Sequence, residues 1–324
     1  MDPKYLEQGG NVHLAYYLEA ADQLGIKYDV IIRSLTARME KDGKIWFMMN
    51  ASVPINGEPS STLSRIKSYT YKVFQHAGIP VAEQAELFSE QDALGFFNQY
   101  KNIVIKPVRN IGGTGITILP QSEDEVRQAY VLARDKNMAS TKVEALAERF
   151  AIGSNYRLLV LGDEVIGAVH RRPAHVTGDG VSTVAQLVEA KNAARKAELM
   201  KPIKLDAQSM LKLRSNGFTE GYVPQAGEEV ELRFNSNLST GGTTEECMSR
   251  IHPSYLDLAI RATKELGLKL GGVDLIAEDV TTPGAAAVIN EINTNPGLRV
   301  HYKVDKGEVV PVATKILSYI VANI

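Results

Sequence analysis

The residues best suited to chemistry stand at the end of an apolar run, where Glu291 is followed two positions later by Asn293 and then by a Pro-Gly turn. Alternate residues of a strand project to one face, so a carboxylate and an amide oxygen would lie side by side. Such oxygen ligands suit a hard divalent cation, above all Mg²⁺ that carries nucleotide phosphates. Asp274 stands alone in a second apolar run, residues 271–277. If the two runs pair as strands, three oxygen ligands converge.

A solvated polar face is the alternative interpretation of this pattern, because polar residues at alternate strand positions often simply face water. Here the neighbours Val288, Ile289 and Ile292 are apolar. A carboxylate in such surroundings is seldom left without a cation. Its partner is then a lysine, an arginine or a metal ion.

A lysine at a strand end precedes a glycine-rich loop. Lys106 closes the apolar run 103–106, and the loop 110–115 contains three glycines. Glycines let backbone N–H groups approach phosphate oxygens, and a lysine adds a mobile positive charge for the same phosphates. The segment matches neither a Walker loop nor a dinucleotide fingerprint, because no Gly-Lys-Ser/Thr opens a helix and a strand follows. A plain hairpin with a glycine turn is the alternative.

Three further segments are ambiguous when each is taken alone. Residues 148–157 run from a strand end into a turn that could face an adenine edge, or could be a surface turn. Arg171 could hold a transferring phosphoryl group, or could belong to a solvated pair with Arg172. The loop 233–242 is rich in donors that suit an anion or a reacting carboxyl group, or is simply flexible.

Composition excludes several classes of protein. The chain has 324 residues, 44% hydrophobic and 23% charged, with a net charge of −2, which is typical of a soluble globular protein with two or three domains or lobes. The sequence contains no basic stripe of the kind that is typical of nucleic-acid-binding proteins. It also contains no apolar run that is long enough to span a membrane. The single cysteine, Cys247, cannot form an intrachain disulfide, which fits a reducing compartment. The N-terminus lacks an apolar signal core, so we expect a cytoplasmic protein.

Helical and strand patterns alternate along the chain with hairpin signals, which favours α+β lobes with largely antiparallel sheets. Gly162-Asp163 predicts a hairpin between residues 157–161 and 164–169. We expect a small N-terminal α/β domain over 1–60, ending in a linker at 51–62. A larger domain follows over 61–324, with lobes at about 61–150 and 151–324. The other expected helices and strands are 11–26, 28–32, 44–50, 64–77, 103–107, 116–119, 123–136, 183–196 and 253–266.

Taken in order, these signals resemble the ATP-grasp superfamily. The similarity is greatest to the ATP-grasp portions of cyanophycin synthetase and of the bifunctional glutamate–cysteine ligase/glutathione synthetase. It covers roughly residues 61–305, and its most specific parts are Gly178-Asp179-Gly180, Asn237-x-Ser239-Thr240-Gly241-Gly242 and Glu291-x-Asn293. The resemblance implies two α+β lobes that grip ATP. It also implies a reaction in which a carboxylate takes the γ-phosphoryl group and the resulting acyl phosphate is attacked by an amine.

The resemblance also implies a role for each matching residue. Lys67 and Lys106 correspond to phosphate-binding lysines, and Gly113 and Gly115 to the mobile loop over the phosphates. Glu148 and Phe150 correspond to the adenine-facing hinge, and Asn155 stands where the family often has an acid for the ribose. The arginines that stabilise charge are Arg157 and Arg171, the loop beside the reacting carboxyl group includes Asn237 and Ser239, and the Mg²⁺ ligands are Asp274, Glu291 and Asn293.

We therefore expect an ATP- and Mg²⁺-dependent carboxylate–amine ligase that releases ADP and joins amino acids or short peptides. The alternatives are an ATP-grasp kinase of small molecules and a non-catalytic nucleotide-binding module. We expect no nucleic-acid or membrane partner, and the sequence is compatible with a homo-oligomer. The small N-terminal domain and the basic stretch 195–225 are expected at the mouth for an anionic carboxylate substrate. A solvated helix with no substrate role is the alternative for the basic stretch.

Overall fold

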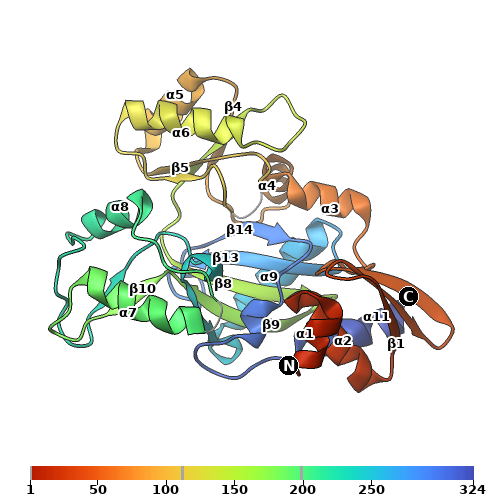
Figure 1. The fold of residues 1–324 in the computed structure, drawn as a ribbon. Coiled ribbons are helices and arrows are strands. Elements are labelled where there is room, and N and C mark those ends of the chain that lie inside the picture. The colour runs from red at the N-terminus through yellow and green to blue at the C-terminus, as the bar shows by residue number, and fades with distance from the viewer. Residues whose placement is uncertain (1, 111–112, 198–199) are drawn as a thin grey trace. The chain divides into compact units, whose positions relative to one another are not determined.

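The protein was analysed as a computed structural model that describes residues 2–110, 113–197 and 200–324. Their contacts divide the chain into two compact units. Unit 1 comprises Met1–Ala168, Met248–Tyr302 and Val310–Ile324, and unit 2 comprises Val169–Cys247 and Lys303–Val309. Figure 1 shows the elements of both units along the chain. Within the described residues, no helix is both long enough and apolar enough to cross a bilayer.

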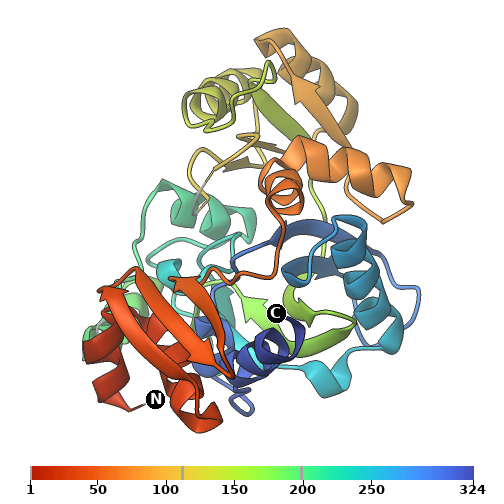
Figure 2. The same ribbon diagram turned by 90° about the vertical axis from the view of Figure 1, so that its right-hand side faces the viewer.

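Unit 1 begins with two helices, α1 (Pro3–Gly9) and α2 (Val12–Leu24). The side chain of Asn11 caps α2 by accepting from the amides of His13 and Leu14, and the helix ends at Gly25 with φ 63°. An antiparallel meander follows, made of β1 (Lys27–Ile32), β2 (Thr36–Lys41) and β3 (Lys44–Met49). Figure 2 shows the three strands side by side, coloured red to orange. The expected helix 11–26 and strands 28–32 and 44–50 are present, and β2 is an addition.

Helices α3 (Glu58–Arg65) and α4 (Lys67–His76) replace the single helix expected over 64–77. Ile66 is extended, with φ −105° and ψ 102°, so the helix is interrupted and restarts. The amide of Lys67 is then free of the preceding helix and donates to the carbonyl oxygen of Val108 at 3.0 Å. The expectation of an uninterrupted helix was wrong, and the break puts Lys67 at a helix start. The expected linker 51–62 likewise ends early, because α3 begins at Glu58.

A four-stranded antiparallel sheet follows in unit 1, in the order β4-β7-β5-β6. Helices α5 (Glu90–Tyr100) and α6 (Glu123–Asp135) pack on it, and their apolar side chains form one buried cluster with Ile103, Ile105, Ala145 and Ala147 (Figure 1). The strands are β4 (Gln84–Leu87), β5 (Ile103–Lys106), β6 (Thr117–Ile118) and β7 (Ala145–Arg149).

The second large sheet of unit 1 pairs β8 (Ser154–Leu161) with β13 (Leu270–Ala277), and β13 with β14 (Ala287–Asn293), all antiparallel. Strand β9 (Glu164–Arg172) lies on the other side of β8, and the hairpin between them turns at Gly162 with φ 59°. Helix α9 (Pro253–Glu265) packs on this sheet, and the shorter α10 (Arg299–Tyr302) and α11 (Val312–Asn323) complete the unit. The expected hairpin and both expected strands are present.

Unit 2 has its own small core of buried residues, including Val176, Val184, Leu213 and Val230. The end of β9 pairs with β12 (Thr243–Glu246), and β10 (His175–Thr177) pairs with β11 (Glu229–Glu231). The helices are α7 (Val184–Ala197), α8 (Ala207–Ser215) and the short 3₁₀ turn η1 (Leu238–Thr240). Asp179 accepts from Val181 and Ser182 in the segment before α7, so the Gly-Asp-Gly motif builds a turn here. The expected domain boundary at residue 60 stays a prediction.

Candidate active site

Three of the predicted residues form one row across the second sheet of unit 1. Arg157 on β8 is directly opposite Asp274 on β13, and Asp274 is directly opposite Glu291 on β14. Opposite residues of antiparallel strands project to the same face, with their Cβ atoms about 5 Å apart. Asn293 follows Glu291 at the same-face spacing and lies opposite Gly272. The pairing that the sequence required is present, and the two carboxylates and the amide share a face.

Arg157 and Asp274 form a buried ion pair. Nε of Arg157 lies 2.5 Å from Oδ1 of Asp274, and Nη2 lies 3.1 Å from Oδ2. The two parallel contacts match the forked geometry in which guanidinium and carboxylate groups bind most strongly. Burial works to lower the pKa of Arg157, but the charges of Asp274 and Glu291 outweigh it, and the pKa is raised. Arg157 therefore remains a cation, next to the two carboxylates among the predicted metal ligands.

Gly272 leaves the space that this ion pair needs. A Cβ atom at Gly272 would lie 2.7 Å from Cβ of Pro296 and 3.2 Å from Nη1 of Arg157. Asn293 is oriented in turn by Glu291, because its Nδ2 donates to Oε1 of Glu291 at 3.1 Å. The amide oxygen of Asn293 is then the atom left to bind a cation.

A second ion pair lies in the four-stranded sheet. Nζ of Lys106, at the end of β5, lies 2.5 Å from Oε2 of Glu148 on β7, and both residues are buried. Nε2 of Gln84 donates to the same oxygen at 3.2 Å. Glu148 was expected beside the adenine, whereas the structure directs its carboxylate to the lysine. Its expected place near the base stays a prediction, and its observed contact fixes the position of Lys106.

The charge of Lys67 interacts with residues of both large sheets of unit 1, Glu291 in one and Lys106 and Glu148 in the other. Burial lowers its pKa, and the charge of Glu291 opposes this lowering, as does that of Glu148, whereas Lys106 adds to it. The Nζ atom of Lys67 donates to Oδ1 of Asn110 at 2.8 Å. The residues brought together in unit 1 are thus the row on the second sheet, the Lys106–Glu148 pair and Lys67. A half-buried ammonium group near two carboxylates and a second lysine can exchange these contacts for phosphate oxygens at low desolvation cost.

The glycine-rich loop begins at Asn110, whose side chain was not recognised from the sequence as part of the site. Its Nδ2 donates to the carbonyl oxygen of Thr114 at 2.8 Å while its Oδ1 holds Lys67. Gly113 and Gly115 have φ values of 79° and 78°, which favour glycine. A Cβ at Gly115 would also lie 2.7 Å from Cβ of Lys136. Ile111 and Gly112 lie outside the described residues, and the role of the loop as a mobile lid stays a prediction.

The predicted hinge connects β7 to β8. The amide of Phe150 donates to the carbonyl oxygen of Asn102 at 2.9 Å. Gly153 has φ 142°, and a Cβ there would lie 2.5 Å from the carbonyl carbon of Ala277, so this glycine is required by a close backbone approach. Asn155 lies two residues before Arg157 on β8 and shares its face.

The remaining predicted residues belong to unit 2. Arg171 lies on β9 opposite Thr244 of β12, and Asn237 caps η1. Ser239 lies in η1, and its side chain is outside the described part of the structure. A Cβ at Gly241 would lie 2.5 Å from Cγ1 of Ile203, so packing explains this glycine. Whether these residues act together with the row in unit 1 stays a prediction.

Two polar residues that the sequence placed outside the site hold its strands. Oδ1 of Asn56 accepts from the amides of Lys269 and Leu270 at 2.9 and 3.0 Å, and its Nδ2 donates to the carbonyl oxygens of Leu270 and Thr294 at 2.8 and 3.3 Å. The hydroxyl of Ser64 donates to the carbonyl oxygen of Ile292. These bonds tie the start of β13 to the end of β14. For Asn56, the only signal in the sequence was a polar residue within the expected linker 51–62.

His301 is buried next to this site, and neither nitrogen of its imidazole ring has a hydrogen-bond partner among the described residues. Burial lowers the pKa of His301 to about 3, and the charge of Arg157 contributes. A Cβ at Gly167 would lie 3.0 Å from Nδ1 of His301, so the ring is closely packed. At neutral pH the imidazole is uncharged, in keeping with the structural role expected for it.

Among the described residues, no group of three or more His, Cys, Asp and Glu side chains is close enough to hold a metal ion. A cation at the row would therefore have two carboxylates and an amide oxygen as its protein ligands. These are all hard oxygen donors, which is the ligand set that Mg²⁺ takes when it also keeps water and phosphate oxygens. Asp274 has oxygen lone pairs beyond those that face Arg157.

Comparisons with known proteins agree with the resemblance seen in the sequence. Residues 222–320 match the family described as the RimK-like ATP-grasp domain. The glutathione biosynthesis bifunctional protein GshAB of Mannheimia succiniciproducens is 36% identical over 246 residues, which is 72% of this chain and 32% of that protein. The cyanophycin synthetase of Trichormus variabilis is 33% identical over 267 residues, 79% of this chain and 29% of that protein. The chain thus spans about a third of the length of these relatives.

The similarity extends to the three-dimensional structure. The crystal structure of a bifunctional glutathione synthetase from Pasteurella multocida superposes with a TM-score of 0.69 and 29% sequence identity, and the match covers 98% of this chain and 45% of that one. The α+β architecture with antiparallel sheets that was expected from the sequence is therefore confirmed.

Proposed function

We propose, from the premise that this chain belongs to the ATP-grasp superfamily, that it is an ATP-dependent carboxylate–amine ligase that forms amide bonds between amino acids or short peptides. The observation that carries the proposal is the row Arg157–Asp274–Glu291 together with Lys67 and Lys106. Such a set neutralises phosphate charge and needs no nucleophile of the protein. The names of the relatives, which make glutathione and cyanophycin, support amino acids or peptides as substrates.

Mg²⁺ fits the oxygen donors of Asp274, Glu291 and Asn293, and when bound it supplies positive charge to the phosphate oxygens of ATP. Glu291 orients Asn293, and Arg157 fixes the carboxylate of Asp274. Each ligand is therefore held in place by a second protein group, which is how metal sites are usually preorganised.

Lys67, Lys106 and the backbone of the glycine-rich loop are suited to the phosphates. Glu148 holds the ammonium group of Lys106, and Asn110 holds that of Lys67. In the proposed reaction a carboxylate oxygen of the first substrate bonds to the γ-phosphorus and ADP leaves. The amine nitrogen of the second substrate then bonds to the acyl carbon, phosphate leaves and the nitrogen loses a proton. Arg157 and Arg171 are the proposed cations for the charge that develops.

A cytoplasmic location is part of the proposal. The one cysteine, Cys247, is buried and cannot form a disulfide within the chain. A chain without an intrachain disulfide fits a reducing compartment, where ATP is also available.

The test is a screen of amino-acid and dipeptide pairs for ADP release, with mass spectrometry of the product. We expect ADP release that requires both an acid and an amine, and a product whose mass equals their sum less one water. ADP release with a phosphorylated product and no amine requirement would instead identify a kinase. No turnover with any pair, combined with ATP binding, would support a non-catalytic nucleotide-binding module.

A further inference from the structure

Unit 2 contains a cavity of about 330 Å³ beside the loop that was predicted to face the reacting carboxyl group. Thr240 belongs both to that loop and to the wall of the cavity. The cavity is lined by Lys201, Pro202, Lys204, Asp206, Arg233 and Thr240. Three cationic side chains thus face one carboxylate.

The carboxylate of Asp206, the one acidic group that lines the cavity, already has hydrogen-bond partners. Oδ1 of Asp206 accepts from the amides of Gln208 and Ser209 and so caps α8, while Oδ2 accepts from Nη2 of Arg233 at 2.7 Å. Lys201 and Lys204 are exposed, and neither side chain has an ion-pair partner among the described residues. The cavity therefore has more positive charge than its own acid can neutralise.

Arg233 adds a buried donor. Its residue is 5% exposed, and its Nη atoms bond to Asp206, Gln208 and the carbonyl oxygen of Lys204. Its Nε is buried and has no hydrogen-bond partner among the described atoms. A buried N–H without a partner is destabilising, so an acceptor that reaches this N–H from the cavity would be favoured.

Two other basic residues of this region have partners outside the cavity. Arg195 is buried and donates to the backbone carbonyl oxygens of Lys201 and Leu238. Lys212 pairs with Glu231 at 2.9 Å. Of the basic residues that the sequence placed at the substrate mouth, only Lys201 and Lys204 line this cavity.

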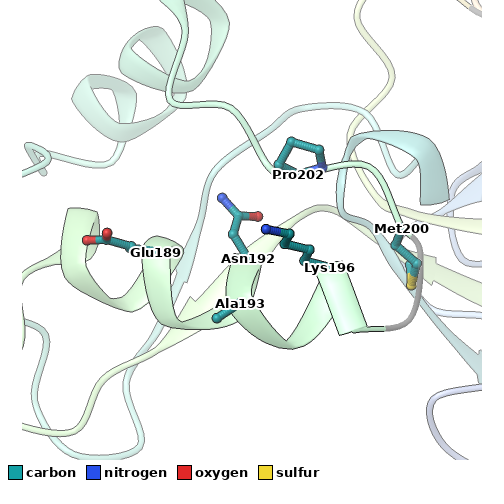
Figure 3. A pocket seen from close by; sticks show the side chains of 6 residues that line it. All are labelled: Glu189, Asn192, Ala193, Lys196, Met200 and Pro202. Carbon is teal, nitrogen blue, oxygen red and sulfur yellow. The ribbon is translucent and has the colours of Figure 1, made fainter.

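A neighbouring cavity of about 380 Å³ shares Pro202 but has a different character. Figure 3 shows Asn192 and Lys196 projecting from α7 toward the segment that contains Pro202. Both polar atoms of the Asn192 side chain are hydrogen-bonded to Ile203. Nδ2 donates to the carbonyl oxygen of Ile203, and Oδ1 accepts from the backbone N–H of Ile203. Lys196 is the single cation of this second cavity and provides a matched control.

We infer that the Lys201–Lys204–Arg233 cavity binds a second anionic group of the carboxylate substrate, so that this substrate is a dicarboxylate such as an acidic amino acid or a peptide that ends in one. The inference rests on the proposed function for the reacting carboxyl group, which would lie by Thr240. The second carboxylate would pair with the two lysines and accept from Arg233. A neutral side chain of the same size would gain none of these contacts.

The experiment compares N-acetyl-L-glutamate with N-acetyl-L-glutamine, which has the same size but one carboxylate fewer. Calorimetry is carried out without nucleotide and again with Mg²⁺ and a non-hydrolysable ATP analogue. We expect the glutamate probe to bind at least about tenfold more tightly than the glutamine probe. The double variant Lys201→Ala/Lys204→Ala should remove this preference, whereas Lys196→Ala should keep it.

Equal binding of the two probes in both conditions, or an equal loss in Lys196→Ala, would overturn the inference. The outcome is separable from the fate of the proposed function. Probe binding with the expected preference but no ligase turnover would reject the ligase and keep the cavity as an anion site. Ligase turnover that is indifferent to a second carboxylate would keep the ligase and reject the cavity assignment.

Discussion

Arg157 and Asp274 face each other across β8 and β13, and their side chains form a forked ion pair that is buried beside Glu291. The arginine therefore compensates a carboxylate that the proposed metal site also needs. Removing one member of a buried pair leaves a charge without a partner, which typically costs about 3–5 kcal/mol.

The first prediction concerns the stability of this pair. Arg157→Met should lower the free energy of unfolding by about 3–5 kcal/mol. The double variant Arg157→Met/Asp274→Leu should lose clearly less, because no charge remains buried. Urea unfolding of the wild type, the single variants Arg157→Met and Asp274→Leu, and the double variant measures these losses. A double variant that loses the sum of the two single losses would show that the residues do not depend on each other.

The second prediction concerns the second ion pair. Glu148→Gln keeps the size of the side chain but removes the charge that holds Nζ of Lys106. We expect it to raise KM for ATP about tenfold with a smaller change in kcat, and Lys106→Met to do at least as much, since charge-assisted bonds contribute about 1.5–3 kcal/mol. Lys101→Gln, on an exposed lysine, is the control. Equal effects at positions 101 and 106 would point to general surface charge.

The third prediction is a pH dependence of stability that arises from His301. Its pKa is about 3 in the folded protein against an ordinary value of 6.5, so the unfolded chain binds the extra proton between these values. The free energy of unfolding should therefore fall by about 1.4 kcal/mol for each pH unit below 6.5. The decline should be shallower in His301→Leu, and unaltered in His76→Gln, whose ring is exposed. An identical slope in wild type and His301→Leu would rule His301 out as its source.

The fourth prediction assigns a positioning role to Asn56. Its four hydrogen bonds join the start of β13 to the residue after Asn293, and each contributes about 1 kcal/mol. Asn56→Ala should raise the free Mg²⁺ concentration for half-maximal activity several-fold and speed amide exchange in β14. Asn98→Ala, on an exposed residue of α5, is the control. Faster exchange throughout unit 1 without a shift in the Mg²⁺ dependence would reduce Asn56 to a general stabilising residue.

Tyr16 and Tyr302 stack at 3.9 Å between ring centroids, which anchors α2 to α10, shortly after β14 in the chain. The N-terminal helices and the Asn56 segment thus contact the same part of unit 1 that carries Glu291 and Asn293. This gives the N-terminal helices a physical link to the candidate site.

The sequence predicted the strands of the row because Asp274, Glu291 and Asn293 interrupt apolar runs at strand spacing. The contact between Lys106 and Glu148 could not be predicted in the same way. These residues are 42 positions apart, and their contact depends on the register of β5 with β7, which local patterns do not determine. The break at Ile66 was hidden by a continuous helical pattern, and tertiary bonding of Lys67 to Val108 accompanies it.

Glycines gave a mixed signal. Gly113 fits a loop that needs a positive φ, as expected for close approach to phosphate. The absence of a side chain at Gly115 and Gly241 can also be explained by close packing, because a Cβ atom would approach Lys136 at Gly115 and Ile203 at Gly241. A sequence pattern does not separate these two causes, because both require the absence of a Cβ atom.

The central claim is that the face shared by Asp274, Glu291 and Asn293 serves a metal-dependent ligase reaction, and Glu291→Gln tests it most directly. The measurement is amine-dependent ADP release at saturating Mg²⁺, with Glu308→Gln as a control on an exposed glutamate and melting temperatures to verify folding. We predict a folded Glu291→Gln protein whose rate is at least about a hundredfold below wild type, because charge stabilisation at a metal is worth several kcal/mol. A folded Glu291→Gln protein with the wild-type rate would contradict the claim.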